Sequence, residues 1–156
     1  MEMERIQALL RELDKRGVQY ILVGAVAMNV LGILRATQDI DLFLPRDTGN
    51  LARLKDALRA VWDDPEIEGI RGEDLLEEYG VIRYGPPGER LTVDLITHLG
   101  EAFSYEDLQA EEIEWRGIKV RVATPETLFR MKKDTLRPQD RADAAQLSEK
   151  FGLRDH

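Results

Sequence analysis

The sequence predicts an α/β fold, because stretches with apolar residues at helical spacing alternate with short apolar stretches that suit strands. The chain has 156 residues, of which 43% are hydrophobic, and this is enough for one compact core. No repeat, low-complexity tract or linker marks an internal boundary. Residues 1–156 are therefore expected to form a single domain.

The first third of the chain predicts a helix, a strand and a second helix. Apolar residues lie at helical spacing in residues 3–16, and Gly17 ends this pattern. Residues 20–23 suit a short buried strand, which Gly24 ends. Residues 25–31 suit a helix, so this region predicts a strand, a tight turn and a helix in direct succession.

The middle of the chain predicts one strand and one helix. Residues 39–44 alternate polar and apolar side chains, as a half-buried strand does. Residues 48–62 return to helical spacing. Residues 63–78 are strongly acidic with little hydrophobic periodicity, so they predict a surface loop with one short helix.

The second half predicts two hairpins followed by two helices. Residues 85–88, with glycine at both ends and two prolines between, suit the turn of the first hairpin, and Arg116 with Gly117 suits the turn of the second. One helix is expected after Thr124, which is a capping residue, and another near Pro138. The expected strands are residues 81–84, 91–97, 111–115 and 118–122.

The composition excludes several kinds of site. The chain has no cysteine, which excludes disulfides, thiolate zinc sites and cysteine nucleophiles. Its two histidines (His98, His156) and two serines (Ser104, Ser148) include no Gly-x-Ser-x-Gly turn, so a Ser/His/Asp triad is not expected. The formal net charge of -8 argues against a broad basic surface for duplex nucleic acid. Chemistry that depends on carboxylates, lysines and backbone amides, including a magnesium site, stays open.

No part of the sequence suits a membrane protein. The longest apolar stretch, residues 21–34, is shorter than the ~20 residues of a membrane span. The first residues lack the basic-then-apolar order of a signal peptide. We therefore expect a cytoplasmic protein without a membrane partner.

Asp39 and Asp41 are the first candidate site residues. Because side chains two apart on a strand point to the same face, both carboxylates can share one metal site. The intervening Ile40 points into the core and anchors the strand. The alternative is the solvated face of an ordinary amphipathic strand.

Gly24 and Ala25 are the second candidates. A glycine at a strand-to-helix turn lets a ligand approach the backbone closely, and the amides at the start of a helix suit a phosphate. The alternative is a glycine that only the turn requires. An acidic strand nearby favours the phosphate site, because magnesium commonly bridges carboxylates and phosphate oxygens.

Asp94 is a lone carboxylate in the otherwise apolar strand 91–97. Either it points to solvent, or it faces Asp39 and Asp41 across neighbouring strands. Three clustered carboxylates repel one another unless cations neutralise them. The second arrangement would therefore be a metal site.

The order of these features resembles the nucleotidyltransferase superfamily related to DNA polymerase beta. That superfamily has a Gly-Gly or Gly-Ser turn that opens a helix, an acidic-x-acidic strand and a third acidic residue on a later strand. Gly24-Ala25, Asp39-x-Asp41 and Asp94 match these motifs in order. Ala25 departs from the usual Gly or Ser and removes a possible hydroxyl donor, although it keeps the backbone amide.

The resemblance covers about residues 18–150, and residues 23–42 are similar to small bacterial members that include AbiEii-type toxins. It implies a nucleotidyltransferase fold, in which a mixed sheet has helices on one face, carboxylates on the other and a carboxyl-terminal helical segment. It also implies transfer of a nucleoside monophosphate from a nucleoside triphosphate such as ATP to a hydroxyl acceptor. Two Mg²⁺ ions held by Asp39, Asp41 and Asp94 would serve this reaction.

The resemblance also implies that Lys132 meets the nucleotide phosphates, whereas helix phase places Lys133 in solvent. The alternative for Lys132 is likewise a solvated helix lysine. Arg35 and Thr37 lie between the expected helix and the acidic strand, near the expected phosphates; the alternative for them is an exposed loop. Three residues around the start of the last expected helix are further candidates. The alternative for the two acidic ones is that the helix dipole alone favours them there. They are Arg137, Asp140 and Asp143.

Several functions stay open at this point. The acceptor can be RNA or tRNA, a protein or a small molecule such as a lincosamide drug, and the chain can be a toxin-antitoxin component with a cognate partner. The alternative from another class is a nucleotidyltransferase fold with weak or lost catalysis that acts as an antitoxin or binding module. The three aspartates argue against that alternative, and Ala25 argues for it.

Overall fold

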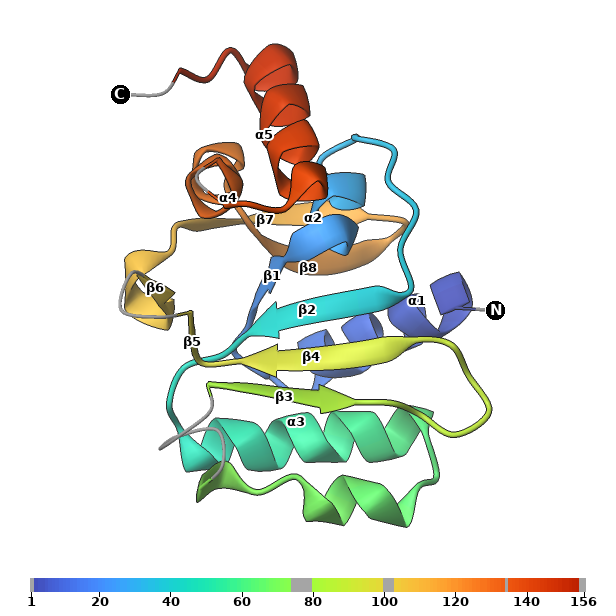
Figure 1. The fold of residues 1–156 in the computed structure, drawn as a ribbon. Coiled ribbons are helices and arrows are strands. Elements are labelled where there is room, and N and C mark those ends of the chain that lie inside the picture. Colours follow the sequence, from blue (N-terminus) through green and yellow to red (C-terminus); the bar gives the residue numbers. More distant parts are fainter. Residues whose placement is uncertain (1, 74–79, 100–102, 134, 155–156) are drawn as a thin grey trace.

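The computed structural model describes residues 2–73, 80–99, 103–133 and 135–154. Six strands form one sheet in the order β3-β4-β2-β1-β8-β7 (Figure 1). The sheet is mixed, because β2 pairs parallel with β4 and β1 pairs parallel with β8, while the other neighbours are antiparallel. The strands are β1 (Ile21–Val23), β2 (Asp39–Phe43), β3 (Val81–Tyr84), β4 (Thr92–Ile96), β7 (Ala110–Trp115) and β8 (Ile118–Ala123).

Helices follow the strands as the sequence predicts, so the α/β fold is confirmed. Each observed boundary lies within one or two residues of the expected one, because hydrophobic periodicity marks the interior of an element better than its end. The carboxyl-terminal helices α4 and α5 pack against each other beyond β8 (Figure 1). The helices are α1 (Glu2–Lys15), α2 (Gly24–Val30), α3 (Thr48–Val61), α4 (Pro125–Lys132) and α5 (Pro138–Phe151), with short 3-10 helices η1 (Pro65–Gly69) and η3 (Tyr105–Asp107).

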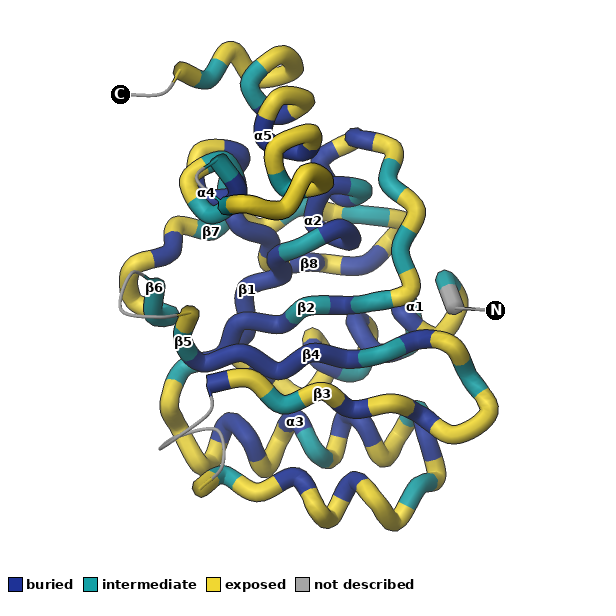
Figure 2. The backbone as a smooth tube through the Cα atoms, in the orientation of Figure 1, coloured by how far each residue is buried: buried dark blue, intermediate teal, exposed yellow. Residues whose placement is uncertain are grey.

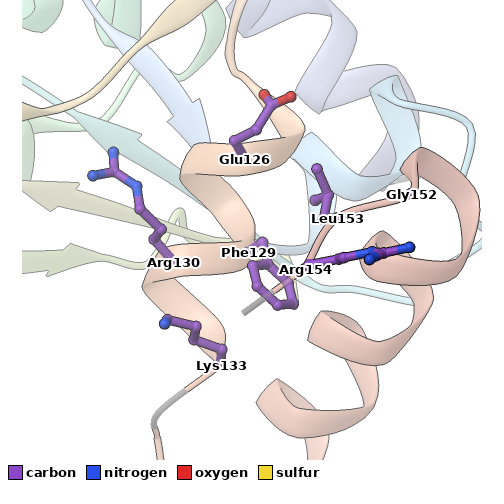
Figure 3. A pocket seen from close by; sticks show the side chains of 7 residues that line it. All are labelled: Glu126, Phe129, Arg130, Lys133, Gly152, Leu153 and Arg154. Atoms are coloured by element: carbon purple, nitrogen blue, oxygen red, sulfur yellow. The ribbon is translucent and has the colours of Figure 1, made fainter. Parts of the chain in front are cut away.

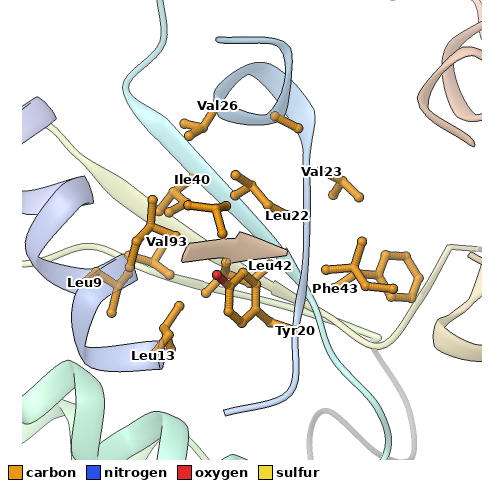
Figure 4. Packing of buried hydrophobic residues seen from close by; sticks show 14 of the residues in the cluster. Leu9, Leu13, Tyr20, Leu22, Val23, Val26, Ile40, Leu42, Phe43 and Val93 are labelled. Atoms are coloured by element: carbon orange, nitrogen blue, oxygen red, sulfur yellow. The ribbon is translucent and has the colours of Figure 1, made fainter. Parts of the chain in front are cut away.

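One face of the sheet is apolar and is covered by helices α1 and α3, which contact each other. Leu42 and Val93 on this face lie within the same buried cluster as Leu9 and Leu13 of α1 (Figure 4). Figure 2 shows that the central strands are the most continuously buried part of the chain. Because strand side chains alternate between faces, the residues between these apolar ones lie on the opposite face.

Local chemistry explains where two of the elements begin or turn. The Thr124 hydroxyl accepts a hydrogen bond from the Thr127 backbone N–H at 3.2 Å, and Pro125 takes the first helical position of α4. Arg116 and Gly117 both have positive φ angles, 53° and 78°, which a two-residue hairpin turn requires. Both features confirm the predicted boundaries.

Two regions differ from expectation. A short strand pair, β5 (His98–Leu99) with β6 (Phe103–Ser104), and η3 were not predicted. The acidic run 63–78 does contain a short helix, η1, but it is not only a surface loop, because Ile67 and Ile70 are buried in the core. Residues 74–79 of this run lie outside the described residues.

Candidate active site

Asp39, Asp41 and Asp94 lie on one face of two adjacent strands. β2 and β4 run parallel, with Asp41 directly opposite Asp94 and Asp39 opposite Thr92. The apolar residues between them point to the other face, toward α1 and α3. The structure therefore brings together the three carboxylates that the sequence singled out.

Each carboxylate has a different set of partners. The Thr92 hydroxyl donates a hydrogen bond to Asp39. Asp94, which is 8% exposed, accepts two hydrogen bonds from the Arg83 guanidinium, from Nε at 2.9 Å and from Nη2 at 3.2 Å. Sequence reasoning missed Arg83, although the alternation within the first hairpin could have placed it on this face.

Asp41 has the least favourable electrostatic environment of the three. Burial raises the pKa of Asp41 well above its ordinary value, and a hydrogen bond with Asp94 and the negative charges of Asp94 and Asp39 raise it further. The positive charge of Lys132 opposes this shift. The structure thus disfavours the ionised form of Asp41 unless a cation joins the cluster.

Gly24 lies directly against this cluster. Its φ angle is 74°, and a Cβ built on it would overlap the Asp41 carboxylate. The glycine is therefore required both by the backbone conformation and by the close approach of Asp41. Ala25, the next residue, is buried within α2.

Lys132 and Arg35 converge on a carboxylate outside the predicted cluster. Lys132 Nζ is 2.9 Å from Asp143 Oδ2 and 3.5 Å from Asp140 Oδ1, and Arg35 Nε is 3.1 Å from Asp143 Oδ1. Asp143 is fully buried. Although burial alone would raise the pKa of Asp143, hydrogen bonds from Lys132, Gln139 and Arg35 lower it below its ordinary value.

Other predicted residues have structural contacts. The Thr37 hydroxyl donates to the Asp39 backbone carbonyl at 2.9 Å and accepts from the Asp39 N–H at 3.0 Å, which fixes the start of β2. Arg137 is largely exposed, with Nε 3.8 Å from Asp140. His98, the first residue of β5, contacts Arg46 at 3.0 Å.

A pocket of about 410 Å³ lies on the other face of α4, between this helix and the residues after α5 (Figure 3). Lys133 lines it and is half-buried, so it is less exposed than helix phase predicted. None of the three carboxylates lines the pocket. Its lining residues are Glu126, Phe129, Arg130, Lys133, Gly152, Leu153 and Arg154.

The carboxylates suit a divalent cation by their chemistry, since magnesium prefers oxygen ligands. Within the described part of the chain, no three or more His, Cys, Asp or Glu side chains converge in the arrangement of a metal site. Among the described helices, none combines the length and the apolar character that crossing a membrane requires.

Comparisons with known proteins show the family of the chain and its fold. Residues 2–153 match a family model described as "Nucleotidyl transferase of unknown function (DUF2204)". No curated protein matches the chain by sequence.

Three solved structures share the fold. The lincosamide antibiotic adenylyltransferase LnuA, with lincomycin bound, aligns with a TM-score of 0.60 and 15% identity over 93% of this chain and 95% of that one. ANT(2")-Ia in complex with adenylyl-2"-tobramycin aligns with a TM-score of 0.57 and 16% identity, over 94% and 87%. A candidate nucleotidyltransferase of Thermotoga maritima aligns with a TM-score of 0.54 and 11% identity, over 96% and 91%.

Proposed function

Because the chain belongs to the nucleotidyl transferase family DUF2204, we propose that it moves a nucleoside monophosphate from a nucleoside triphosphate to a hydroxyl acceptor and releases pyrophosphate. The chain is thus a nucleotidyltransferase of the minimal superfamily. We take its whole length, of which the family model spans residues 2–153, as one catalytic domain.

A single observation supports the proposal most strongly: the register of β2 and β4. It places Asp41 opposite Asp94, with Asp39 two residues away on the same face. Crowded carboxylates destabilise a fold unless cations neutralise them. Three carboxylates at this place are therefore not expected if they serve only to stabilise the fold. Burial raises the pKa of Asp41 most, and the hydrogen bond with Asp94 and the negative charges of Asp94 and Asp39 raise it further.

We propose that Asp41 and Asp94 hold magnesium and that Asp39 joins them when its side chain leaves Thr92. The donor set fits the ion, because all three side chains supply oxygen. When bound, magnesium supplies charge neutralisation for the phosphates and lowers the pKa of the attacking hydroxyl. We expect two magnesium ions to bind at this site.

The remaining residues would act on the triphosphate. The missing side chain at Gly24 lets the Asp41 carboxylate lie against the backbone at the start of α2. A phosphate bound beside Asp41 would therefore be near the backbone amides of Gly24 and Ala25. Lys132 lies close enough to act on Asp41 electrostatically, so its ammonium is placed to balance phosphate charge. Arg35 and Thr37, which precede β2, would border the same region.

A second candidate function is a binding module, such as an antitoxin, with weak or lost catalysis. One observation favours it: Lys132 and Arg35, the cations expected to meet phosphate, are already paired with the buried Asp143. In either case the chain can be one half of a toxin-antitoxin pair.

The reaction is tested with nucleoside triphosphates labelled at either the α or the γ position. Each is incubated with separate RNA, protein and small-molecule acceptors, the last including lincomycin and tobramycin. Label should enter one acceptor class from the α position only, with release of pyrophosphate, and Asp39→Asn should abolish both. Asp63→Asn, at an exposed position, is the matched control and should keep full activity. Transfer from the γ position would identify a kinase, and no transfer to any acceptor would favour the binding module.

A further inference from the structure

Arg83 borders the carboxylate face on the side away from α4. It lies on β3, the strand at one edge of the sheet, whereas α4 follows β8 near the other edge (Figure 1). Arg83 is opposite Asp94 in the β3–β4 pair, and Asp94 is opposite Asp41 in the β4–β2 pair. Arg83, Asp94 and Asp41 therefore form one row across three strands.

The guanidinium of Arg83 uses both oxygens of Asp94. Its Nε and Nη2 atoms lie 2.9 Å and 3.2 Å from Oδ1 and Oδ2, which is the bidentate arrangement that holds a carboxylate most firmly. This contact supplies positive charge to Asp94, as a bound cation would. A cation that binds at Asp94 must therefore compete with Arg83.

The two partners differ in their freedom to move. The Arg83 side chain is 65% exposed, whereas the Asp94 side chain is 11% exposed. Arg83 can thus swing away without disturbing the core, but Asp94 is held in place. If the pair opens, Arg83 is the partner that moves.

We infer that Arg83 exchanges partners, binding Asp94 in the metal-free protein and the triphosphate of the substrate once magnesium occupies Asp94. This inference rests on the proposed function. A guanidinium suits the second partner because its planar donors match phosphate oxygens. Arg83 is then a substrate-binding residue on the edge opposite Lys132.

The exchange predicts that Arg83→Gln changes the affinities for two ligands in opposite directions. Arg83→Gln removes the competitor for Asp94, so magnesium alone should bind about three- to tenfold more tightly. The same substitution removes a phosphate ligand, so inorganic triphosphate should bind about three- to tenfold more weakly in saturating magnesium. A residue that only supports the fold would not move these two affinities in opposite directions.

The test is calorimetric titration of the intact chain, first with magnesium chloride and then with inorganic triphosphate, which does not depend on the preferred base. Arg83→Lys keeps the charge and should retain magnesium affinity near that of the wild type. Arg90→Gln is the matched control, because Arg90 is exposed and makes no ion pair among the described residues. It should change either affinity by less than about twofold. Thermal melts establish that each variant is folded.

The outcomes separate this inference from the proposed function. If the wild type binds magnesium and Arg83→Gln changes neither affinity, or weakens both, the exchange is overturned while the magnesium site stands. If the wild type binds no magnesium, the proposed site fails and the exchange fails with it. The exchange is supported only if Arg83→Gln binds magnesium more tightly and inorganic triphosphate more weakly than the wild type does.

Discussion

Asp41 and Asp143 lie in electrostatic environments that shift their pKa values in opposite directions. Asp41 lies beside Asp94 and near Asp39, and its pKa is raised. Asp143 is fully buried, yet hydrogen bonds from Lys132, Gln139 and Arg35 lower its pKa. The fold therefore stabilises the ionised form of Asp143 and disfavours the ionised form of Asp41.

This difference distinguishes a structural carboxylate from one available to a ligand. The donors around Asp143 come from the loop before β2, from α4 and from α5 itself, so the carboxylate joins three segments. Under the proposed function, the carboxylates around Asp41 would instead be neutralised by a bound cation. Lys132 connects both regions, because it pairs with Asp143 and also acts on Asp41.

The largest expected effect comes from removing the unbalanced charge. Asp41→Asn should lower the transfer rate on the order of a thousandfold, because a metal ligand and its charge are lost at the reacting centre. It should also abolish most of the rise in melting temperature that magnesium causes by binding to the native state. Activity assays and thermal melts measure both. A magnesium response equal to that of the wild type would show that Asp41 is not a ligand.

The next largest effect is on stability and comes from the balanced carboxylate. Asp143→Asn removes the buried carboxylate that pairs with Lys132 and Arg35, and leaves Lys132 only the more distant Asp140. The free energy of unfolding should fall by about 2–4 kcal/mol, as measured by urea denaturation. Asp140→Asn, at the more exposed carboxylate of the same network, should cost less. Equal losses would show that Asp143 is not the centre of the network.

The lowered pKa of Asp143 also fixes the sign of a pH effect. Its contribution to stability is fully present above the ordinary carboxyl pKa of about 3.9 and is lost as pH falls through the lower folded value. The stability difference between wild type and Asp143→Asn should therefore shrink in strong acid. Urea titrations at neutral pH and at successively lower pH values below about 4 measure this trend.

The sequence predicted the two regions unequally, for a physical reason. Asp39 and Asp41 share a face because strand alternation is a local rule, and the adjacency of Asp94 follows once β2 and β4 pair in register. The pairing of Arg35 with Asp143 spans 108 positions and depends on how α5 packs. No local periodicity contains that information, so Asp143 was only one of several acids near a helix start.

The same difference between local and long-range information explains which elements of the fold could be predicted from the sequence. Long periodic elements such as α1 and α3 were predictable from spacing alone. β5 and β6 have two residues each, which is too short for a period to be read. Gly24 was predictable as a turn residue, but its close approach to Asp41 depends on the antiparallel pairing of β1 with β2.

A smaller effect tests whether Lys132 belongs to both regions. Lys132→Met keeps the apolar stem but removes the charge, so the affinity for inorganic triphosphate should fall about tenfold. Lys133→Met, on the pocket side of α4, is the matched control and should change this affinity by less than about twofold. Calorimetry in saturating magnesium measures both. An unchanged affinity in Lys132→Met would show that Lys132 serves only the Asp143 network, and similar losses in the two variants would show that the effect is not specific to Lys132.

The smallest expected effect has the sign opposite to that of Asp143→Asn. In the absence of metal, Asp41 is crowded by Asp94 and Asp39, and asparagine at this position fills a similar volume without the charge. Asp41→Asn should therefore raise the free energy of unfolding by about 0.5–1 kcal/mol in EDTA, although it removes catalysis. Urea denaturation with a chelator measures this gain, and added magnesium should reverse the order of wild type and variant, because only the wild type then gains binding energy. A loss of stability in EDTA as large as that of Asp143→Asn would mean that the fold balances the charge of Asp41 as it does that of Asp143, and the contrast between the two carboxylates would be wrong.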